Sequence, residues 1–296
     1  MATASTLEES FKENPQSLQH ILPIDFHSIQ EVPNSHLWPD INNSSISHDE
    51  KNPNVPIIDL LAPNVVELIG KMTFCLASRT EGESRFTIMD SPLDHAKELW
   101  PHDYQIFCDV MENYQKKMKA LSFQLWLLIL NYLQPYSQEH SIKSFESTGA
   151  LQLNSYPCCP NPNHALGLAP HTDSLFLTIL HQTNNTKGLQ ILKKDQVWTS
   201  IAPVSNDALI VNVGHLLHIL SNGEFPSVYH RVLVDQTKHR VSLAYFFGPQ
   251  VDSMIVPLVS SKDNVGVEPK YRNVKVKEYL DLKAKHLEKV FSMIRF

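Results

Sequence analysis

The spacing of apolar residues predicts a helical layer in the middle of the chain. Between residues 94 and 136, apolar side chains recur at intervals of three, four or seven positions, which is typical of helices with one buried face. The positions that carry this pattern are Leu99, Phe107, Val110, Met111, Met118, Leu121, Leu125 and Leu128. The most apolar run, residues 121–133, is too short to span a membrane, so we interpret it as part of a buried helix.

The pattern changes near Gly149 to short runs of alternating or β-branched residues, separated by Gly, Asn and Pro. Several short strands at this spacing, without intervening helices, predict an antiparallel sandwich or barrel. The runs that we expect to form strands are residues 151–156, 175–181, 188–192, 197–201, 208–213, 228–234 and 241–247. The fold class predicted from this pattern is mainly β with flanking helices.

The segments before and after the β region differ in their residue patterns. Residues 1–55 contain several prolines among Asn and Ser, which indicates an irregular arm with at most one short helix, and residues 55–60 resemble a short strand. After Pro269 the helical pattern returns. We therefore expect an N-terminal arm and helical support region at 1–145, a β core at 146–250 and a C-terminal helical extension at 251–296.

Composition and charge indicate which classes of molecule the protein can bind. The chain has 296 residues, of which 42% are hydrophobic and 19% charged, so it can bury a large core without disulfides or structural metals. A net charge of −6 lacks the basic field that nucleic-acid binding needs. We expect a monomer that binds a small molecule and neither nucleic acid nor a membrane.

The cysteines and the N-terminus favour the cytoplasm. Four cysteines are too few and too irregularly spaced for a secreted disulfide framework, and none forms a CxxC pair. They are Cys75, Cys108, Cys158 and Cys159. Residues 1–9 show no basic region followed by an apolar segment, so we expect no signal peptide.

Candidate metal ligands lie within the β region. His171 and Asp173 are two positions apart, so on an extended segment both side chains leave the same face and can converge on one ion. His230, in a second predicted strand, supplies a third ligand. Two imidazoles and one carboxylate form the facial triad of non-haem iron(II) oxygenases, which leaves coordination positions open. An HxD pair alone also arises by chance, and such a set can also bind zinc in a hydrolase.

Arg240 and Ser242 supply a second, independent signal. They are two positions apart on one predicted strand, where the planar Arg fork and the Ser hydroxyl can bind one carboxylate. Alone, Arg240 would be interpreted as part of a surface salt bridge. Beside a metal with open positions, this clamp predicts a 2-oxo acid cosubstrate, which a zinc hydrolase would not need.

These motifs together resemble the plant iron(II)- and 2-oxoglutarate-dependent dioxygenases. Residues 151–160 resemble the family's NxYPxC segment, whose Tyr, here Tyr156, donates to the cosubstrate carboxylate. His171, Asp173 and His230 fall on the family's iron ligands, and Arg240 with Ser242 on its RxS motif. The resemblance implies a double-stranded β-helix, or jelly-roll, core at 146–250. It also implies iron(II) and 2-oxoglutarate as cofactor and cosubstrate, with ascorbate as the reductant.

Segments outside the β region resemble one subfamily, the gibberellin 3-beta-dioxygenases. They lie at residues 25–33, 91–95, 99–104 and 283–286. This resemblance implies hydroxylation of a gibberellin precursor at the 3-beta position by dioxygen, with release of succinate and carbon dioxide. Two alternatives remain open: a dioxygenase for another gibberellin position or plant metabolite, and an inactive truncated paralogue that acts as a binding module.

Two departures from the family pattern are visible. His215 stands where relatives carry an Asp, and its offset from the triad predicts a turn residue and not a metal ligand. Near residues 71–85 the chain is shortened, because a strand, a long helix and a Gly-rich loop of the relatives have no counterpart. We expect this loss to expose an edge of the core sheet and some apolar surface.

Overall fold

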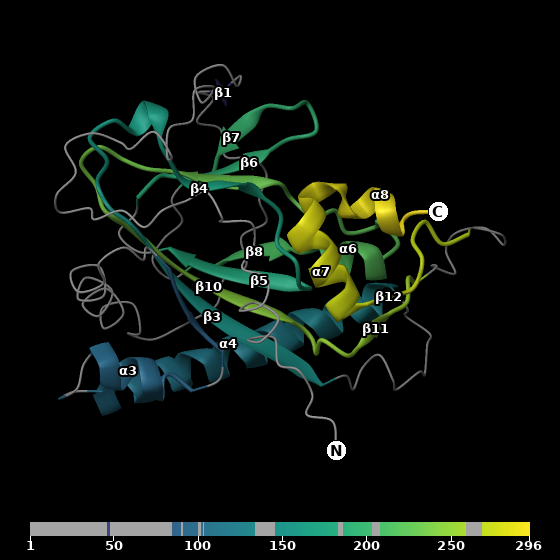
Figure 1. Ribbon diagram of the computed structural model, residues 1–296, viewed down its shortest axis with the longest axis horizontal. Helices are drawn as coiled ribbons and strands as arrows, with labels where there is room; N and C mark the ends of the chain where they lie inside the picture. Colours follow the sequence, from purple (N-terminus) through teal and green to yellow (C-terminus); the bar gives the residue numbers. More distant parts are fainter. Residues whose placement is uncertain are drawn as a thin grey trace.

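Two five-stranded β-sheets face each other at the centre of the molecule, as Figure 1 shows. The structure is a computed structural model that describes residues 46–47, 85–89, 91–99, 102, 104–133, 146–182, 186–202, 208–258 and 268–296. The strand expected at 55–60, Cys75 and the predicted shortening near 71–85 lie outside these residues, apart from Arg85 itself.

One sheet, here called the major sheet, is antiparallel throughout. Its strands, in spatial order, are β2 (Arg85–Ile88), β3 (Ser147–Tyr156), β10 (Arg240–Pro249), β5 (Leu177–Gln182) and β8 (Ile210–Val213). The long central pair, β3 and β10, stays in register from Arg240 opposite Tyr156 to Pro249 opposite Ser147. This unbroken register fixes which residues of the two strands share a face.

The facing sheet, the minor sheet, is smaller and less regular. Its order is β1 (Ile46–Ser47), β7 (Trp198–Ser200), β6 (Leu189–Leu192), β9 (His230–Leu233) and β4 (Leu166–His171). Only β1 and β7 run parallel among these pairs. The two sheets confirm the predicted mainly-β class with its short antiparallel strands.

Strand β4 was not predicted, and its sequence explains why. Gly167 and Pro170 lie inside it, and both residues are poor strand formers. Pro is tolerated because β4 is an edge strand, where one side of the backbone needs no ladder partner. The register with β9 also shifts twice along the pair, so no regular alternation marks the strand.

The predicted helical layer is confirmed, but it is divided into two helices. They are α3 (Leu93–Leu99) and α4 (Tyr104–Leu133), which lie along the outer face of the major sheet (Figure 1). Buried α4 residues such as Met111 and Trp126 face the sheet, and the ring of Trp126 stacks on that of Phe176 at 4.5 Å between centroids. The amphipathic spacing thus positions α4 as a cover for the major sheet.

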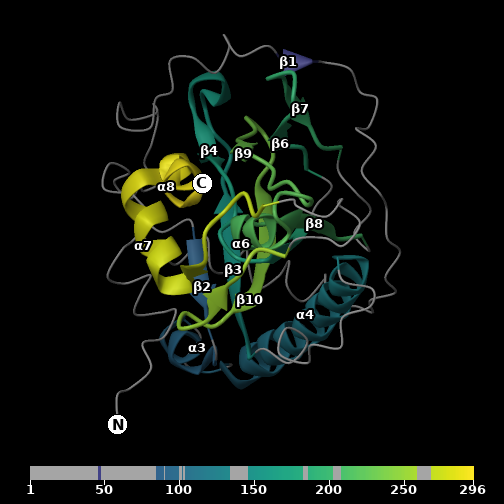
Figure 2. The ribbon, with the colours of Figure 1, turned by 90° about the vertical axis from the view of Figure 1, so that its right-hand side faces the viewer.

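The C-terminal extension lies at one end of the two sheets, the end that faces the viewer in Figure 2. It begins with the two-stranded sheet of β11 (Met254–Ile255) and β12 (Val274–Lys275). Three helical segments follow: α7 (Val276–His286), the 3-10 turn η3 (Leu287–Lys289) and α8 (Val290–Ile294). Two further short helices, η2 (Pro162–His164) and α6 (His215–Leu220), interrupt the β region.

The apolar residues form two separate clusters, because successive side chains of a strand point to opposite faces. The larger cluster contains the outward-facing residues of the major sheet together with α4 and the C-terminal helices. Leu175, Ile179 and Phe247 belong to it and pack in the core. A smaller cluster, including Leu180, Ile210 and Ala244, lies between the two sheets.

Within the described part of the chain, no helix combines the length and the apolar character that crossing a membrane requires. The longest, α4, carries exposed polar residues such as Lys116 and Lys117 along its outer face.

Candidate functional site

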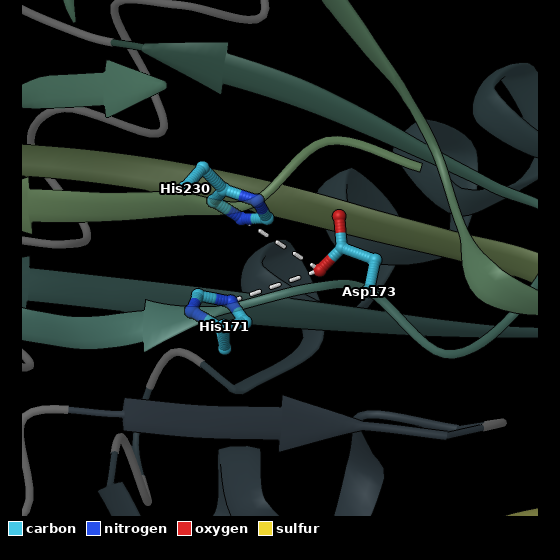
Figure 3. Close-up of side chains that lie close together, drawn as sticks. All are labelled: His171, Asp173 and His230. Atoms are coloured by element: carbon cyan, nitrogen blue, oxygen red, sulfur yellow. Dashed lines mark ion pairs between the residues drawn. The ribbon is translucent and has the colours of Figure 1, made fainter. Parts of the chain in front are cut away.

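Three side chains converge at one end of the space between the sheets, as Figure 3 shows. The Nε2 atoms of His171 and His230 each lie 3.8 Å from Oδ1 of Asp173, and the ligand atoms of all three are within 4.8 Å of one another. Asp173 and His230 are buried, whereas the side chain of His171 keeps 30% of its surface exposed. The structure thus brings together the three residues that the sequence predicts as metal ligands.

The strands of the minor sheet position the two imidazoles. His171 ends β4 and His230 begins β9, and the two are paired across the antiparallel ladder. Asp173, however, lies in the loop after β4, so the expectation that it shares a strand face with His171 is wrong. The chain leaves the edge strand at His171, and the loop turns the carboxylate back toward the two rings.

Backbone hydrogen bonds orient both rings in the same way. Nδ1 of His171 lies 2.8 Å from the carbonyl oxygen of Ala169, and Nδ1 of His230 lies 3.1 Å from that of Val228. A carbonyl oxygen only accepts, so each Nδ1 carries the proton and each Nε2 presents its lone pair toward Asp173. Such second partners are typical of metal-binding histidines.

The carboxylate of Asp173 also accepts a hydrogen bond. Nδ2 of Asn212, on β8, donates to Oδ2 of Asp173 at 3.4 Å and leaves Oδ1 directed at the imidazoles. Asn212 was not predicted as a site residue. Its only sequence signal is its position as a polar residue inside the apolar run 208–213.

The charge states of His171 and Asp173 suit a metal ion. Burial, with the neighbouring His230, lowers the pKa of His171 to about 4, so its ring is neutral at neutral pH. Burial alone would raise the pKa of Asp173, but His230, His171 and the Thr178 hydroxyl hold it below its ordinary value. Neutral imidazoles and an ionised carboxylate are the forms that bind a divalent cation.

These residues therefore fit a metal of the first transition row. Two imidazole nitrogens and one carboxylate oxygen approach one another, which leaves the opposite positions of a shared metal ion for other ligands. No other group of three or more His, Cys, Asp or Glu among the described residues could hold a metal ion.

Arg240 forms the second half of the site. It is only 2% exposed, it donates from Nη1 to Oγ of Ser242 at 3.3 Å, and its guanidinium carbon lies 5.0 Å from the ring centroid of Tyr156. In the described chain, no Asp or Glu forms an ion pair with Arg240. A buried cation without an anionic partner is costly, so this residue fits an anionic ligand.

Gln182 is a further contact of Arg240 that was not predicted. Its Oε1 accepts from Nη2 of Arg240 at 2.7 Å, and its position at the end of β5 lies opposite Ser242 on β10. The alternation of β5 could have identified it, because Thr178, Leu180 and Gln182 must share one face.

Asp173 and Arg240 lie near opposite ends of one surface, the inner face of the major sheet. The register places Ser242 opposite Gln182 near Arg240, and it places Thr178 opposite Asn212 near Asp173. Leu180 lies between these two levels of β5 and belongs to the inner apolar cluster. The site thus has polar groups at both ends and an apolar wall between them, which suits a short molecule that is charged at both ends.

His215 is not part of this site, but it is not a turn residue either, so that prediction is corrected. It is the first residue of α6, it is fully buried, and its Nδ1 lies 2.6 Å from the hydroxyl oxygen of Tyr279 on α7. Its backbone N–H donates to the carbonyl oxygen of Asp173 at 2.8 Å. Gly214 allows this approach, because a Cβ there would clash with the carbonyl oxygen of Leu175.

Comparison with known proteins gives one consistent result. The sequence model of the 2OG-Fe(II) oxygenase superfamily matches residues 147–249. Gibberellin 3-beta-dioxygenase 1 of Pisum sativum is 37% identical over an alignment that covers 98% of this chain and 94% of the relative. Gibberellin 3-beta-dioxygenase 1 of Arabidopsis thaliana is also 37% identical, with 98% of each chain covered.

A solved structure shows the same fold. The structure of JOX2 in complex with 2OG, Fe and JA superposes with a TM-score of 0.66 at 23% sequence identity, and the match covers 85% of this chain and 89% of that one. This likeness identifies the two facing sheets as the double-stranded β-helix that the sequence predicted.

The alignment length also bears on the predicted shortening. The alignment with the Pisum sativum relative spans 356 positions, whereas this chain has 296 residues, so at least 60 positions of the alignment have no residue of this chain. The chain therefore lacks segments that this relative contains.

Proposed function

The chain belongs to the 2OG-Fe(II) oxygenase superfamily and, within it, to the family of the gibberellin 3-beta-dioxygenases, and from this we propose that it hydroxylates a gibberellin precursor at the 3-beta position. The reaction consumes dioxygen and 2-oxoglutarate and releases succinate and carbon dioxide. Full-length similarity to several gibberellin 3-beta-dioxygenases supports the choice of substrate.

One structural observation carries the proposal. A His-Asp-His triad with an open side lies near one end of the space between the sheets, and near the other end lies buried Arg240, which has no acidic partner among the described residues. A molecule with a keto acid at one end and a carboxylate at the other matches both ends at once, and 2-oxoglutarate has this structure.

The site residues divide into two groups in this proposal. His171, Asp173 and His230 hold iron(II), which when bound supplies the activation of dioxygen that couples decarboxylation of 2-oxoglutarate to hydroxylation of a carbon–hydrogen bond. The Nδ1 bonds and Asn212 keep the three ligand atoms directed at one point. Because these hydrogen bonds fix the ligand side chains before the metal binds, metal binding orders fewer groups and costs less free energy.

The second group binds the cosubstrate. Arg240, Ser242 and Tyr156 offer donors to the far carboxylate of 2-oxoglutarate, and Arg240 supplies the opposite charge. The apolar wall that includes Leu180, Ile210 and Ala244 excludes water between the carboxylate and the metal. Water exclusion strengthens the charge interaction and limits side reactions.

The alternatives are not favoured. An inactive binding module would have no need for three metal-ligand atoms held within 4.8 Å of one another. A zinc hydrolase would leave the buried guanidinium of Arg240 without a purpose. A dioxygenase for another metabolite would share the site, but the relatives that match along 98% of this chain are gibberellin 3-beta-dioxygenases.

The proposal also covers the oligomeric state, the compartment and the partners of the enzyme. We propose a monomer that acts in the cytoplasm on a small-molecule substrate, binds neither nucleic acid nor a membrane, and uses ascorbate as reductant. The free thiols of Cys108, Cys158 and Cys159 support a reducing compartment. We also propose that the jelly-roll domain at 146–250 carries every residue of the site, between a support region at 1–145 and an extension at 251–296.

A substrate panel tests this function. Purified protein is incubated with iron(II), ascorbate, 2-oxoglutarate labelled at C1 and a set of gibberellins, and labelled carbon dioxide and products are measured. We expect gibberellins without a 3-beta hydroxyl group to stimulate carbon dioxide release and to gain that hydroxyl group. Stimulation by no gibberellin, or hydroxylation only at other carbons, would refute the proposed substrate or position.

A further inference from the structure

One polar atom of the Gln182 side chain forms a hydrogen bond, and the other does not. Its Oε1 accepts from Nη2 of Arg240 at 2.7 Å, but its Nε2 is buried and has no hydrogen-bond partner among the described residues. The residue is only 6% exposed, so water does not readily satisfy this donor. An unsatisfied buried N–H group costs stability unless a ligand provides the acceptor.

The unbound donor lies next to the cationic end of the site. The oxygen and nitrogen of one amide are attached to the same carbon, so an acceptor for Nε2 of Gln182 must lie beside the guanidinium of Arg240. Arg240 itself has a further unbound donor, because its Nε is also buried without a partner in the described residues. Two buried donors without acceptors, on two side chains that contact each other, indicate a place for an anion.

The strand register explains how Gln182 reaches this place. Gln182 lies opposite Ser242, which in turn lies opposite Asn154, so the three residues form one row across β5, β10 and β3. The face is fixed by the alternation of β5, on which Leu180 also points inward. Gln182 thus lies at the Arg240 end of the inner face, where the proposed function puts the far carboxylate of the cosubstrate.

We infer that Gln182 is a 2-oxoglutarate-binding residue, whose Oε1 fixes the guanidinium of Arg240 and whose Nε2–H group donates to the far carboxylate of 2-oxoglutarate. This assignment rests on the proposed function. It differs from a purely structural role, in which the amide would only connect β5 to Arg240. The neutral amide matters because it orients Arg240 without cancelling its charge.

Two substitutions separate these roles. Gln182→Met keeps the length of the side chain but removes both polar atoms, so it loses the donor to the ligand and the support of Arg240. Gln182→Glu keeps an acceptor for Arg240, so the structural bridge survives or strengthens as an ion pair. A carboxylate at this position would nevertheless neutralise Arg240 and repel the carboxylate of 2-oxoglutarate.

A second buried Gln–Arg pair provides the matched control. Gln190 on β6 is 1% exposed, and its Oε1 accepts from Nε of Arg231 at 2.8 Å, while its Nε2 donates to Ser200. Gln190→Met therefore breaks a buried bond of the same kind, but to Arg231 on β9 and not to Arg240. It reports the general effect of losing such a bond on the fold.

The test measures equilibrium binding of 2-oxoglutarate by calorimetry to the full-length protein with manganese(II) in place of iron, so that no turnover occurs. We expect the Kd to rise about tenfold in Gln182→Met and about a hundredfold in Gln182→Glu, because the lost bonds involve charged groups. Manganese affinity and the Kd of Gln190→Met should stay within about twofold of the parent. In turnover, KM for 2-oxoglutarate should rise while kcat at saturation stays nearly unchanged.

A ligand comparison locates the effect at the far carboxylate. The compound 2-oxopentanoate has the same chain length but no second carboxylate, so the parent and Gln182→Met should bind it equally weakly. Unchanged binding of 2-oxoglutarate to Gln182→Glu would overturn the inference and leave Gln182 as a structural bridge. If the parent itself does not bind 2-oxoglutarate, the proposed function fails as well, so the two failures are distinguishable.

Discussion

Lys283, on α7, donates from Nζ to the backbone carbonyl oxygen of Thr172 at 2.6 Å and to the Thr172 hydroxyl at 3.1 Å. This contact joins the C-terminal extension to the loop that carries Asp173. A second connection runs through Tyr279, whose hydroxyl contacts the ring of His215. The extension therefore supports the metal site, although it contributes no ligand to it.

Replacement of Lys283 by Met should loosen this loop. Both Lys283 and Thr172 are buried, and the carbonyl of Thr172 would lose a charged donor, so the free energy of unfolding should fall by about 1–3 kcal/mol. Metal affinity should fall as well, because Asp173 would be less well fixed. Chemical denaturation and metal titration measure both quantities. Lys285→Met, on the exposed side of α7, is the control, and an equal effect in both variants would contradict the account.

Replacement of any one of His171, Asp173 and His230 by Ala should abolish turnover and leave the fold largely intact. Loss of a supporting residue around a metal site alone costs about 10–100-fold in affinity or activity, so loss of a ligand should cost at least as much. Iron titration and circular dichroism check the two parts. His164→Ala, which alters an exposed histidine, should behave like the parent. Parental iron affinity in all three variants would show that the triad is misassigned.

Arg240→Lys should weaken 2-oxoglutarate binding far more than iron binding. Lysine keeps the charge but loses the planar fork that binds a carboxylate through two hydrogen bonds. Hydrogen bonds to charged groups contribute about 1.5–3 kcal/mol, so KM for 2-oxoglutarate should rise by roughly ten- to a hundredfold. Arg272→Lys, at an exposed ion pair with Glu278, is the control. An unchanged KM would remove Arg240 from the cosubstrate site.

The absence of segments that the Pisum sativum relative contains should lower the stability of the protein and the coupling of 2-oxoglutarate consumption to hydroxylation. It should change the metal and cosubstrate site less. Every assigned metal and cosubstrate residue lies between Tyr156 and Ser242, downstream of the predicted gap near 71–85. The described strand that follows the gap, β2, is at the edge of the major sheet, and α4 exposes Ile106 by 55% and Leu128 by 65%. We expect a protein of lowered stability that consumes 2-oxoglutarate with poor coupling to hydroxylation.

Insertion of the corresponding segment of a relative between residues 70 and 85 tests this expectation. The graft should raise Tm and the ratio of hydroxylated product to succinate. An insertion of equal length composed of Gly and Ser controls for chain length alone. If the parent already matches full-length relatives in both quantities, the segment is dispensable and the expectation is wrong.

Part of this architecture was predictable because local signals agreed with tertiary packing. The three-and-four spacing in α4 reflects one buried face, although Leu128 of that pattern is 65% exposed. The runs in β3 and β10 form strands as predicted, and β10 is buried on both faces. Strand β4 was missed because Pro170 and Gly167 erase the alternation, and only its place at the sheet edge makes them acceptable.

The site was predictable to the extent that its residues recur at fixed spacing. The HxD and RxS patterns identify the residues that meet in space, but not the loop that carries Asp173. Asn212, Gln182 and Lys283 act through contacts between segments distant in the sequence, and no local pattern marks them. His215 was misplaced for the same reason, since its partner Tyr279 lies in another helix.

The most direct test of the central claim follows the two atoms of dioxygen. The protein is incubated under ¹⁸O₂ in ordinary water with iron(II), ascorbate, 2-oxoglutarate and a gibberellin that lacks the 3-beta hydroxyl, and mass spectrometry measures the label in both products. Coupled hydroxylation predicts one ¹⁸O atom in succinate and one in the new hydroxyl group. A hydroxylated product whose oxygen comes only from water, or labelled succinate without any hydroxylated gibberellin, would contradict it.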